Sequence, residues 1–213
     1  MTVYKFSVTE IIMPDKLILT DDLFLGRGNH KEVFIHPDDK RRCVKLLYTI
    51  PDEDFDREMR YRRALGKRVD TMTLLTKYYG EVDTDRGRGF VFERVIDFDD
   101  AESKTVLDHL NNPKSIDDLL DILLNFKRQF INEKFAAAGM DPDNFLVQRT
   151  SPTERLVRII DNVGTSARVP ILYYSDFLMA RRAKKYWRRF VREIQLDHGE
   201  IIIADIAKHL LEN

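Results

Sequence analysis

The chain has 213 residues, of which 43% are apolar and 33% charged, a composition ordinary for a globular protein of one large domain or two lobes. Its net charge of −1 argues against a protein that binds nucleic acid over its whole surface, and its single cysteine excludes an internal disulfide framework. Because the sequence has no apolar run of about 18 residues and its first residues lack the apolar core of a signal peptide, we expect a cytoplasmic protein with no membrane span.

The first half of the sequence predicts short strands around one helix. The strands are expected at residues 17–24, 32–35, 42–48, 74–82 and 89–96. The helix is expected at residues 52–65, because apolar or aromatic side chains recur at helical spacing and Gly66 ends the pattern. An acidic break follows at residues 97–100, and there we place the boundary between a first lobe, residues 1–96, and a second lobe, residues 97–213.

The second half is predicted to be mainly helical. Ser115 is a favourable N-cap for one helix and Ser175 for another, and Gly199 introduces a last helix that ends near Leu211. Between the first two, residues 140–164 predict a hairpin of two apolar strands. Strands, one helix, further strands and then helices indicate an α+β fold rather than alternating βα units.

A glycine-rich stretch at residues 25–33 follows the form Gly-x-Gly-x-x-Gly-x-Val, with Gly26 and Gly28 in place and Lys31 at the third glycine position. Glycines let backbone N–H groups approach phosphate oxygens closely, because no Cβ intervenes. The same residues are also typical of a simple hairpin turn. Lys31 then either adds positive charge near a phosphate or is a solvated turn residue.

Lys45 lies within an apolar strand pattern at residues 43–47. A buried and unpaired ammonium group is costly, so we expect Lys45 to extend to solvent or to have anionic partners. Glu58 on the following helix is one such partner, and the pair would hold the lysine against the α- and β-phosphates of a nucleotide. Alternatively, Glu58 forms a surface ion pair with Arg62, four residues later.

Asn144 and Asp161 stand at the mouth of the predicted hairpin, one before its first strand and one after its second. Two oxygen ligands suit a phosphate-bound Mg²⁺, which keeps most of its waters. In the kinase motif His-Arg-Asp-x-x-x-x-Asn the Asp is the catalytic base, and the matching position here is Gly139, which has no side chain to accept a proton. Asp141 and Asp143 are candidates for a substitute base, and alternatively both are ordinary turn residues.

Glycine loop, strand lysine, helix glutamate, Pro-x-Asn and strand-end Asp follow one another as in a protein kinase, and the chain resembles the protein-kinase-like superfamily over nearly its whole length. More specifically, it resembles the YrbL family of bacterial PhoP-network proteins. In the first half this resemblance rests on Leu25-Gly26-x-Gly28-x-His30-Lys31, His36-Pro37-x-Asp39, Arg42-Cys43-Val44-Lys45, Arg57-Glu58, Leu65-Gly66-Lys67-Arg68 and Tyr79-Gly80-Glu81-Val82-x-Thr84. In the second half it rests on Asp97-Phe98-Asp99, Pro142-x-Asn144, Asp161-Asn162-x-Gly164 and Trp187-x-Arg189-Phe190.

The resemblance implies a two-lobed, protein-kinase-like fold, in which a small strand-rich lobe carries one helix and the second lobe is reduced and mainly helical. It also implies ATP and Mg²⁺ as cofactors. The implied site residues are the phosphate-anchoring Lys45 with its partner Glu58, the phosphate-loop residues Gly26 and Gly28, the metal ligands Asn144 and Asp161, the base-packing Val33 and the hinge from Glu93 to Val95.

Three departures from the kinase pattern concern catalysis. Ala137-Ala138-Gly139 stands where a kinase has His-x-Asp, Asp161-Asn162-Val163-Gly164 is one residue longer than Asp-Phe-Gly, and no Ala-Pro-Glu segment follows. General-base help contributes about 10²–10⁴-fold, and positioning supplies most of the rest of phosphoryl transfer. We therefore expect an ATP- and Mg²⁺-binding regulatory protein that is a pseudokinase or a weak phosphotransferase, with Asp141 as the first candidate for the missing base.

Residues 180–194 form a strongly basic predicted helix. Its cations are Arg181, Arg182, Lys184, Lys185, Arg188, Arg189 and Arg192, opposite an apolar face. The helix is either a solvated part of the second lobe or a docking face for an acidic or phosphorylated protein, RNA or anionic lipid. The alternative function is therefore a partner- or nucleic-acid-binding module with a vestigial nucleotide cleft.

Overall fold

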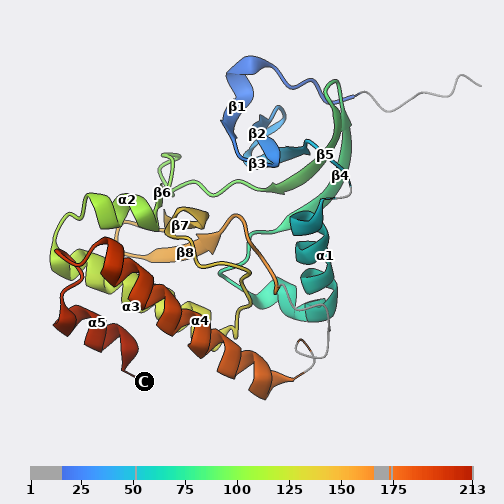
Figure 1. Cartoon of the computed structure of the whole chain (residues 1–213). Helices are drawn as coiled ribbons and strands as arrows, with labels where there is room; N and C mark the ends of the chain where they lie inside the picture. Colours follow the sequence, from blue (N-terminus) through green and yellow to red (C-terminus); the bar gives the residue numbers. More distant parts are fainter. Residues whose placement is uncertain (1–15, 51, 166–172, 174, 213) are drawn as a thin grey trace, which may run out of the picture.

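The computed structural model describes residues 16–50, 52–165, 173 and 175–212, and these residues form an α+β fold of two antiparallel sheets and several helices (Figure 1). In chain order the elements are η1 (Asp21–Leu23), β1 (Phe24–Arg27), β2 (Lys31–His36), β3 (Asp39–Leu47), α1 (Glu53–Leu65), η2 (Gly66–Thr71), β4 (Tyr78–Thr84), β5 (Gly87–Glu93), β6 (Lys104–Thr105), α2 (Val106–Asn111), α3 (Ile116–Asn132), η3 (Pro142–Asn144), β7 (Phe145–Arg149), β8 (Arg155–Ile159), α4 (Asp176–Asp197) and α5 (Ala204–Leu211). The predicted α+β class is confirmed. The predicted absence of a signal peptide concerns residues 1–15, which lie outside the described residues.

The first sheet has five strands in the order β1-β2-β3-β5-β4, and α1 covers one of its faces. On that face Phe55 of α1 packs on Phe90 of β5, with ring centroids 4.1 Å apart. The helix begins where the Asp52 carboxylate accepts hydrogen bonds from two backbone N–H groups, and it ends at Gly66, whose φ of 55° favours glycine. The helix predicted at residues 52–65 is thus confirmed as Glu53–Leu65 together with its stop at Gly66, and Asp52 proves to be its N-cap.

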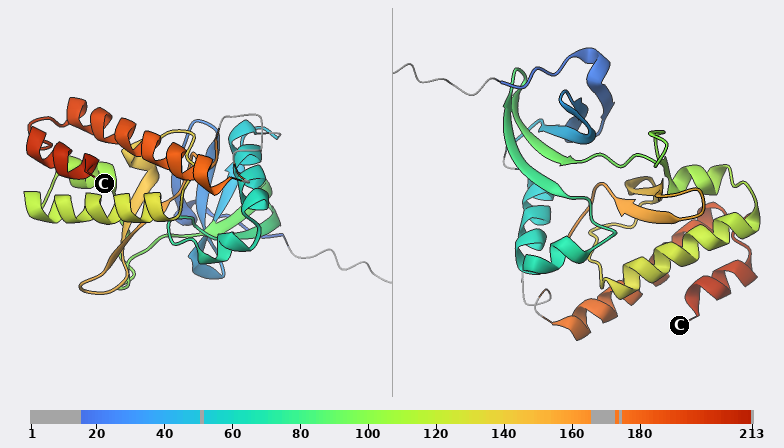
Figure 2. Two further views of the ribbon diagram at one scale, coloured as in Figure 1. Left: turned by 90° about the horizontal axis from the view of Figure 1, so that it is seen from below. Right: turned by 180° about the vertical axis from the view of Figure 1, so that it is seen from behind.

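The second sheet, in the order β6-β7-β8, lies between the first sheet and the helices α3, α4 and α5 (Figures 1 and 2). Its core is aromatic: Phe126 of α3 lies with its ring centroid 5.2 Å from that of Trp187 in α4. The indole N–H of Trp187 donates to the carbonyl of Leu210 at 2.8 Å, which fixes α5 on α4. These contacts bury the apolar faces that the sequence predicted for the helical half.

One large core joins this helical part to residues of the predicted first lobe. Tyr61 and Leu65 of α1, together with Leu74 and Leu75, belong to the same buried cluster as Phe126. α1 therefore packs on the first sheet through Phe55 and joins the large core through its second half, where Tyr61 lies against Phe135. The lobe boundary at residue 96 stays a prediction.

Several predicted elements differ from the observed ones. A strand was expected at residues 17–24, but Leu17 makes only a single bridge to Thr84, a 3-10 turn follows at Asp21–Leu23, and β1 begins at Phe24. Two consecutive acids, Asp21 and Asp22, fill that turn instead of the alternating apolar side chains of a strand. Residues 74–77 precede β4, because Leu75 forms a bridge to Ile159 of β8 instead of pairing in the first sheet.

The helices of the second half also depart from expectation at two places. The last helix begins at Ala204 rather than just after Gly199. The short helix α2 was not predicted, although Thr105 and Asp108 form a capping box at its start. None of the helices in the described part of the chain combines the length and the apolar composition that crossing a bilayer requires.

Candidate functional site

A cavity of about 330 Å³ lies between the two sheets. The five-stranded sheet contributes Leu25, Gly26, Val33 and Lys45 to its wall. The opposite wall comes from the chain around β7 and β8, with Asn144, Leu146, Ile160 and Asp161. A second cavity of about 410 Å³ adjoins it, because Lys31, Lys45, Asp143, Asn144 and Asp161 line both. The first cavity is the more apolar of the two, although Glu93, Arg94 and Glu102 also line it, and the second carries most of the charge.

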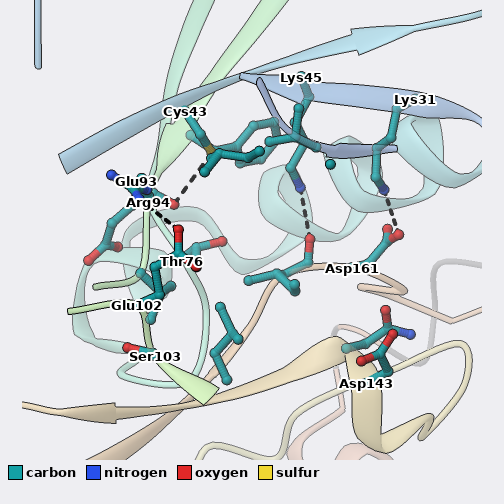
Figure 3. A pocket seen from close by; sticks show the side chains of 18 residues that line it. Lys31, Cys43, Lys45, Thr76, Glu93, Arg94, Glu102, Ser103, Asp143 and Asp161 are labelled. Carbon is teal, nitrogen blue, oxygen red and sulfur yellow. Dashed lines mark hydrogen bonds and ion pairs between the residues drawn. The ribbon is translucent and has the colours of Figure 1, made fainter. Parts of the chain in front are cut away.

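Lys45 projects from β3 into the region that the two cavities share (Figure 3). Its side chain is 8% exposed, its ammonium lies 4.2 Å from the ring centroid of Phe92, and it donates a hydrogen bond to the carbonyl of Ile160 at 2.8 Å. Burial lowers the pKa of Lys45, while the negative charges of Glu58 and Asp161 act in the opposite direction. An anionic ligand beside this ammonium would relieve the cost of burying it.

Glu58 is bonded to Arg62 and not to Lys45. Within α1 its Oε1 accepts from Arg62 Nε at 2.8 Å and from Nη2 at 2.5 Å, and Arg62 also donates to the carbonyl of Thr76 at 2.8 Å. The expected ion pair between Lys45 and Glu58 is therefore corrected: the alternative partner four residues along the helix is the one present. The pair is nevertheless buried, not on the surface, and Glu58 lines the second cavity.

Asp161 follows β8 and faces Lys31 across the cavity (Figure 3). Lys31 Nζ lies 2.5 Å from Asp161 Oδ2, and Asp161 Oδ1 accepts from the backbone N–H of Asn162 at 2.9 Å. Burial alone would raise the pKa of Asp161, but the charges of Lys45 and Lys31 and these hydrogen bonds outweigh it and hold the pKa below its usual value. Asp161 is thus an ionised carboxylate in the part of the cavity where a phosphate-bound metal would need one.

Gly26 lies in β1, where it pairs with Val33 and lines the first cavity, and Gly28 lies in the turn between β1 and β2 and lines the second. The N–H of Gly28 donates to the carbonyl of Lys31 at 2.8 Å, which closes the turn. A Cβ built on Gly26 would have no atom within 4 Å, and one on Gly28 would meet only Lys31 at 3.9 Å. Gly28 thus forms part of the hairpin turn of the simpler interpretation, and the open space beside both glycines leaves room for a ligand.

Asn144, Asp143 and Asp141 lie in and beside the turn η3 that leads into β7. Asn144 and Asp143 line both cavities, whereas Asp141 lines only the second. Asp141 is the N-cap of η3, and its Oδ1 accepts from the backbone N–H of Asp143 at 3.1 Å. The turn role that we weighed for Asp141 is therefore present, and its role as a substitute base stays a prediction.

Gly139 stands at the position that matches the catalytic Asp of a kinase, and the two residues before it pair through their backbone with the chain that follows Asp161. The N–H of Ala138 donates to the carbonyl of Asn162 at 2.8 Å, and Ala137 forms a bridge with Val163. Gly139 follows directly, and a Cβ added there would meet only the Asn162 amide nitrogen, at 3.9 Å. There is room for a side chain at Gly139, which lines neither of the two cavities.

Arg57 ties α1 to the segment after Asp161. Its guanidinium donates to the carbonyl of Val163 at 3.2 Å, and its backbone carbonyl lies 3.1 Å from where a Cβ on Gly164 would stand. Gly164 has a φ of 92°, so both its conformation and its surroundings require glycine. Sequence reasoning did not give Arg57 a role in the site, because its partners are more than a hundred residues away in the chain.

The predicted hinge residues Glu93 and Val95 line the first cavity at the end of β5. The Glu93 carboxylate accepts from the backbone N–H of Lys77 at 2.9 Å and forms an ion pair with Arg158 of β8. Arg158 was not predicted as part of the site, and its alternation with apolar neighbours in β8 gave no indication of it. The pair connects the two sheets at the edge of the cavity.

Among the described residues, no three His, Cys, Asp or Glu side chains are arranged to hold a metal by themselves. The side-chain oxygens of Asn144 and Asp161 fit Mg²⁺ bound chiefly through phosphate and water, because that ion needs few protein ligands, although both Asp161 oxygens already accept a hydrogen bond. The apolar side chains at one end and the two lysines at the other fit a nucleotide's base and phosphates.

The predicted basic helix lies within α4 and buries Trp187, Phe190 and Val191 in the large core. Arg189 pairs with Glu193 at 2.7 Å, and Arg182 donates to the hydroxyl of Tyr186 at 2.8 Å. The other cations have no hydrogen bond or ion pair to the described residues; they are Arg181, Lys184, Lys185, Arg188 and Arg192. These five side chains are therefore free to interact with solvent or with an acidic partner.

Comparison with known proteins places the chain in a family. The family model for the PhoP regulatory network protein YrbL matches residues 17–195. The YrbL proteins of Escherichia coli (strain K12) and Shigella flexneri are each 29% identical to this chain over 181 residues, covering 82% of this chain and 86% of the relative. The chain therefore belongs to the YrbL family of PhoP regulatory network proteins.

Proposed function

We propose that this protein has a protein-kinase-like fold and binds ATP with Mg²⁺ in the space between its two sheets. The observation that carries the proposal is the convergence of Lys31, Lys45 and Asp161, from opposite walls, in the space shared by a mainly apolar cavity and a more polar one. Lys45 is buried and its ammonium donates to a backbone carbonyl, so a charged ligand that reaches it would offset the cost of burying it.

In this proposal the two walls of the cavity bind different parts of the nucleotide and its metal. Val33 and Val95 hold the base, and the turn that follows β1 together with Lys45 holds the phosphates, although the Gly28 N–H is already bonded to the carbonyl of Lys31. Asn144 and Asp161 hold the metal, which supplies charge stabilisation to the phosphates when it is bound. Glu58 would act on Lys45 through its charge, without direct contact.

The protein is then a pseudokinase or a slow phosphotransferase with a regulatory role. Gly139 cannot accept a proton, and the Asp141 oxygen nearest the turn is already bonded to a backbone N–H. The loss of a general base reduces the rate by about 10²–10⁴-fold but leaves positioning intact. A conformational response to nucleotide is therefore better supported than rapid turnover.

Thermal unfolding with and without Mg-ATP tests this function. A ligand present at 100 times its Kd adds about 2.7 kcal/mol to the free energy of unfolding, so the unfolding temperature should rise clearly. The shift should be lost in Lys45→Met, and its Mg²⁺-dependent part should be lost in Asp161→Ala. A wild-type protein that shows no shift at saturating Mg-ATP would refute the proposal.

A second candidate function is partner binding through the exposed cations of α4, favoured by the five that lack protein partners among the described residues. It predicts salt-sensitive binding to an acidic partner. Charge reversal at Arg188 and Arg189 should remove that binding, whereas Lys45→Met should leave it unchanged. The opposite pattern would favour the nucleotide cavity.

A further inference from the structure

We propose that Lys31 is a built-in cation of this site, which holds the Asp161 carboxylate in place of a divalent metal ion and lets the cavity bind a nucleotide's phosphates without metal. The inference rests on the proposed nucleotide function and deepens it. It makes Lys31 the residue that sets the balance between metal-bound and metal-free nucleotide.

The ion pair spans the cavity. Lys31 is the first residue of β2, whereas Asp161 follows β8 on the opposite wall, and Nζ lies 2.5 Å from Oδ2. The backbone of Lys31 is held by its pairing with Leu47 of β3 and by the hydrogen bond from Gly28 to its carbonyl at 2.8 Å. The Lys31 ammonium therefore contacts the Asp161 carboxylate from a backbone position that the sheet fixes (Figure 3).

Both oxygens of the Asp161 carboxylate are engaged. Oδ2 binds Lys31, and Oδ1 accepts from the backbone N–H of Asn162 at 2.9 Å. Lys45, the other nearby cation, donates instead to the carbonyl of Ile160. A metal that binds Asp161 through Oδ2 therefore competes with the Lys31 ammonium, and the loss of this charged hydrogen bond weakens metal binding by about ten- to a hundredfold.

Lys31 is also suited to bind phosphate. Lys31 and Lys45 project from adjacent strands, and both line the two cavities beside Gly26 or Gly28. Burial lowers the pKa of Lys45 and the charge of Lys31 lowers it further, whereas Glu58 and Asp161 raise it. Because both ammonium groups line the same space, a ligand with more than one negative charge, such as a di- or triphosphate, suits them.

The simpler alternative is that the pair only joins the two walls. A purely structural pair would lower stability when Lys31 is replaced, and it would leave the affinity for metal unchanged. Metal affinity is therefore the quantity that separates the two interpretations.

The test measures Mn²⁺ binding by electron paramagnetic resonance in the full chain without nucleotide. Lys31→Met should bind Mn²⁺ about ten- to a hundredfold more tightly than wild type, and the added substitution Asp161→Asn should abolish this gain. Lys40→Met is the matched control, because Lys40 is a lysine of the same sheet that pairs with Asp100 at 2.6 Å, and it should bind Mn²⁺ as wild type does.

A second arm titrates ATP in the presence of EDTA. Wild type should bind ATP without metal, and Lys31→Met should lose at least about tenfold in affinity, which Mg²⁺ should restore. Equal Mn²⁺ affinity in wild type and Lys31→Met, with binding still lost in Asp161→Asn, would overturn the inference and leave the metal site standing. Absence of Mn²⁺ binding in every variant, Lys31→Met included, would overturn both the inference and the proposed metal ligands.

Discussion

The carboxylate of Glu58 lies 2.5 Å from the guanidinium of Arg62, one turn along the same helix, and both side chains are 8% exposed. Arg62 also donates to the carbonyl of Thr76, so this pair connects α1 to the chain that precedes β4. Lys45 is left to donate to Ile160, and one Arg62 nitrogen, Nη1, has no hydrogen-bond partner among the described residues. The helix glutamate therefore supports the structure around the cavity more directly than it holds the lysine.

Replacing Arg62 should destabilise the protein. Arg62→Ala leaves the buried Glu58 carboxylate without its partner, and the free energy of unfolding should fall by about 3–5 kcal/mol. Urea unfolding at pH 7 measures the change. Arg63→Ala, which removes an exposed arginine from the same helix turn, should cost far less, and equal losses in the two variants would contradict this account.

Gly139→Asp should supply a carboxylate that accepts a proton at the position that matches the catalytic Asp of a kinase. Gly139→Asp is sterically tolerated, because an added Cβ meets only one atom within 4 Å. If the site transfers phosphate slowly, ATP turnover should rise by about 10²–10⁴-fold. Gly139→Asn has the same size without a base, so equal rates in the two variants would show that position 139 does not face the reacting atoms.

The single cysteine offers a direct probe of the cavity. Cys43 lines it and is 7% exposed, and burial raises the pKa of its thiol, so reaction with an aromatic disulfide at pH 7 should be slow. ATP at 100 times its Kd should slow the reaction further, by up to about a hundredfold, because the free protein becomes about 1% of the total. Lys45→Met should lose this protection. Nucleotide binding that leaves the Cys43 rate unchanged would place the ligand elsewhere.

Asp97 should contribute stability that depends on pH. It accepts hydrogen bonds from Ser103 at 2.6 Å and from Arg149 at 2.6 Å and 2.9 Å, and these outweigh burial and hold its pKa below the usual value. Since the folded-state pKa is the lower one, the stabilisation is complete above the unfolded-state pKa and is lost as the pH falls through the folded-state value.

The test compares Asp97→Asn with wild type by urea unfolding at pH 7 and near pH 3. The variant should be less stable by about 2 kcal/mol at pH 7, and the difference should shrink at the lower pH. The exposed Asp70→Asn serves as control and should differ little from wild type at either pH. A difference for Asp97→Asn that stays constant or grows in acid would contradict the assignment.

The parts of the fold that depend on local signals could be predicted from the sequence. The Asp52 cap, the Gly66 stop and the Ser115 and Ser175 caps all mark the helix ends that are observed. The capping box at Thr105 was also visible and would have revealed α2. The prediction of a strand at residues 17–24 was wrong because Leu19 is buried without pairing in a strand. No local sequence pattern distinguishes this kind of burial from that of a strand residue.

Residues that line the cavity could be predicted from the sequence, but the groups to which each of them bonds could not. The strand position of Lys45 and the hairpin with Asn144 and Asp161 followed from periodicity and turn residues. The pairing of Lys31 with Asp161 joins residues 130 positions apart, so it depends on how the two sheets face each other. Glu58 had two possible partners in the sequence, and only the packing of α1 decides between them.

The most direct test of ATP binding in the cavity is a calorimetric titration of ATP into the full chain, with Mg²⁺ present, for wild type, Lys45→Met and Lys40→Met. Wild type should bind ATP saturably at one site per chain. Binding should be lost or at least about tenfold weaker in Lys45→Met and unchanged in Lys40→Met. Absence of binding to wild type, or equal binding by all three proteins, would contradict ATP binding in the cavity.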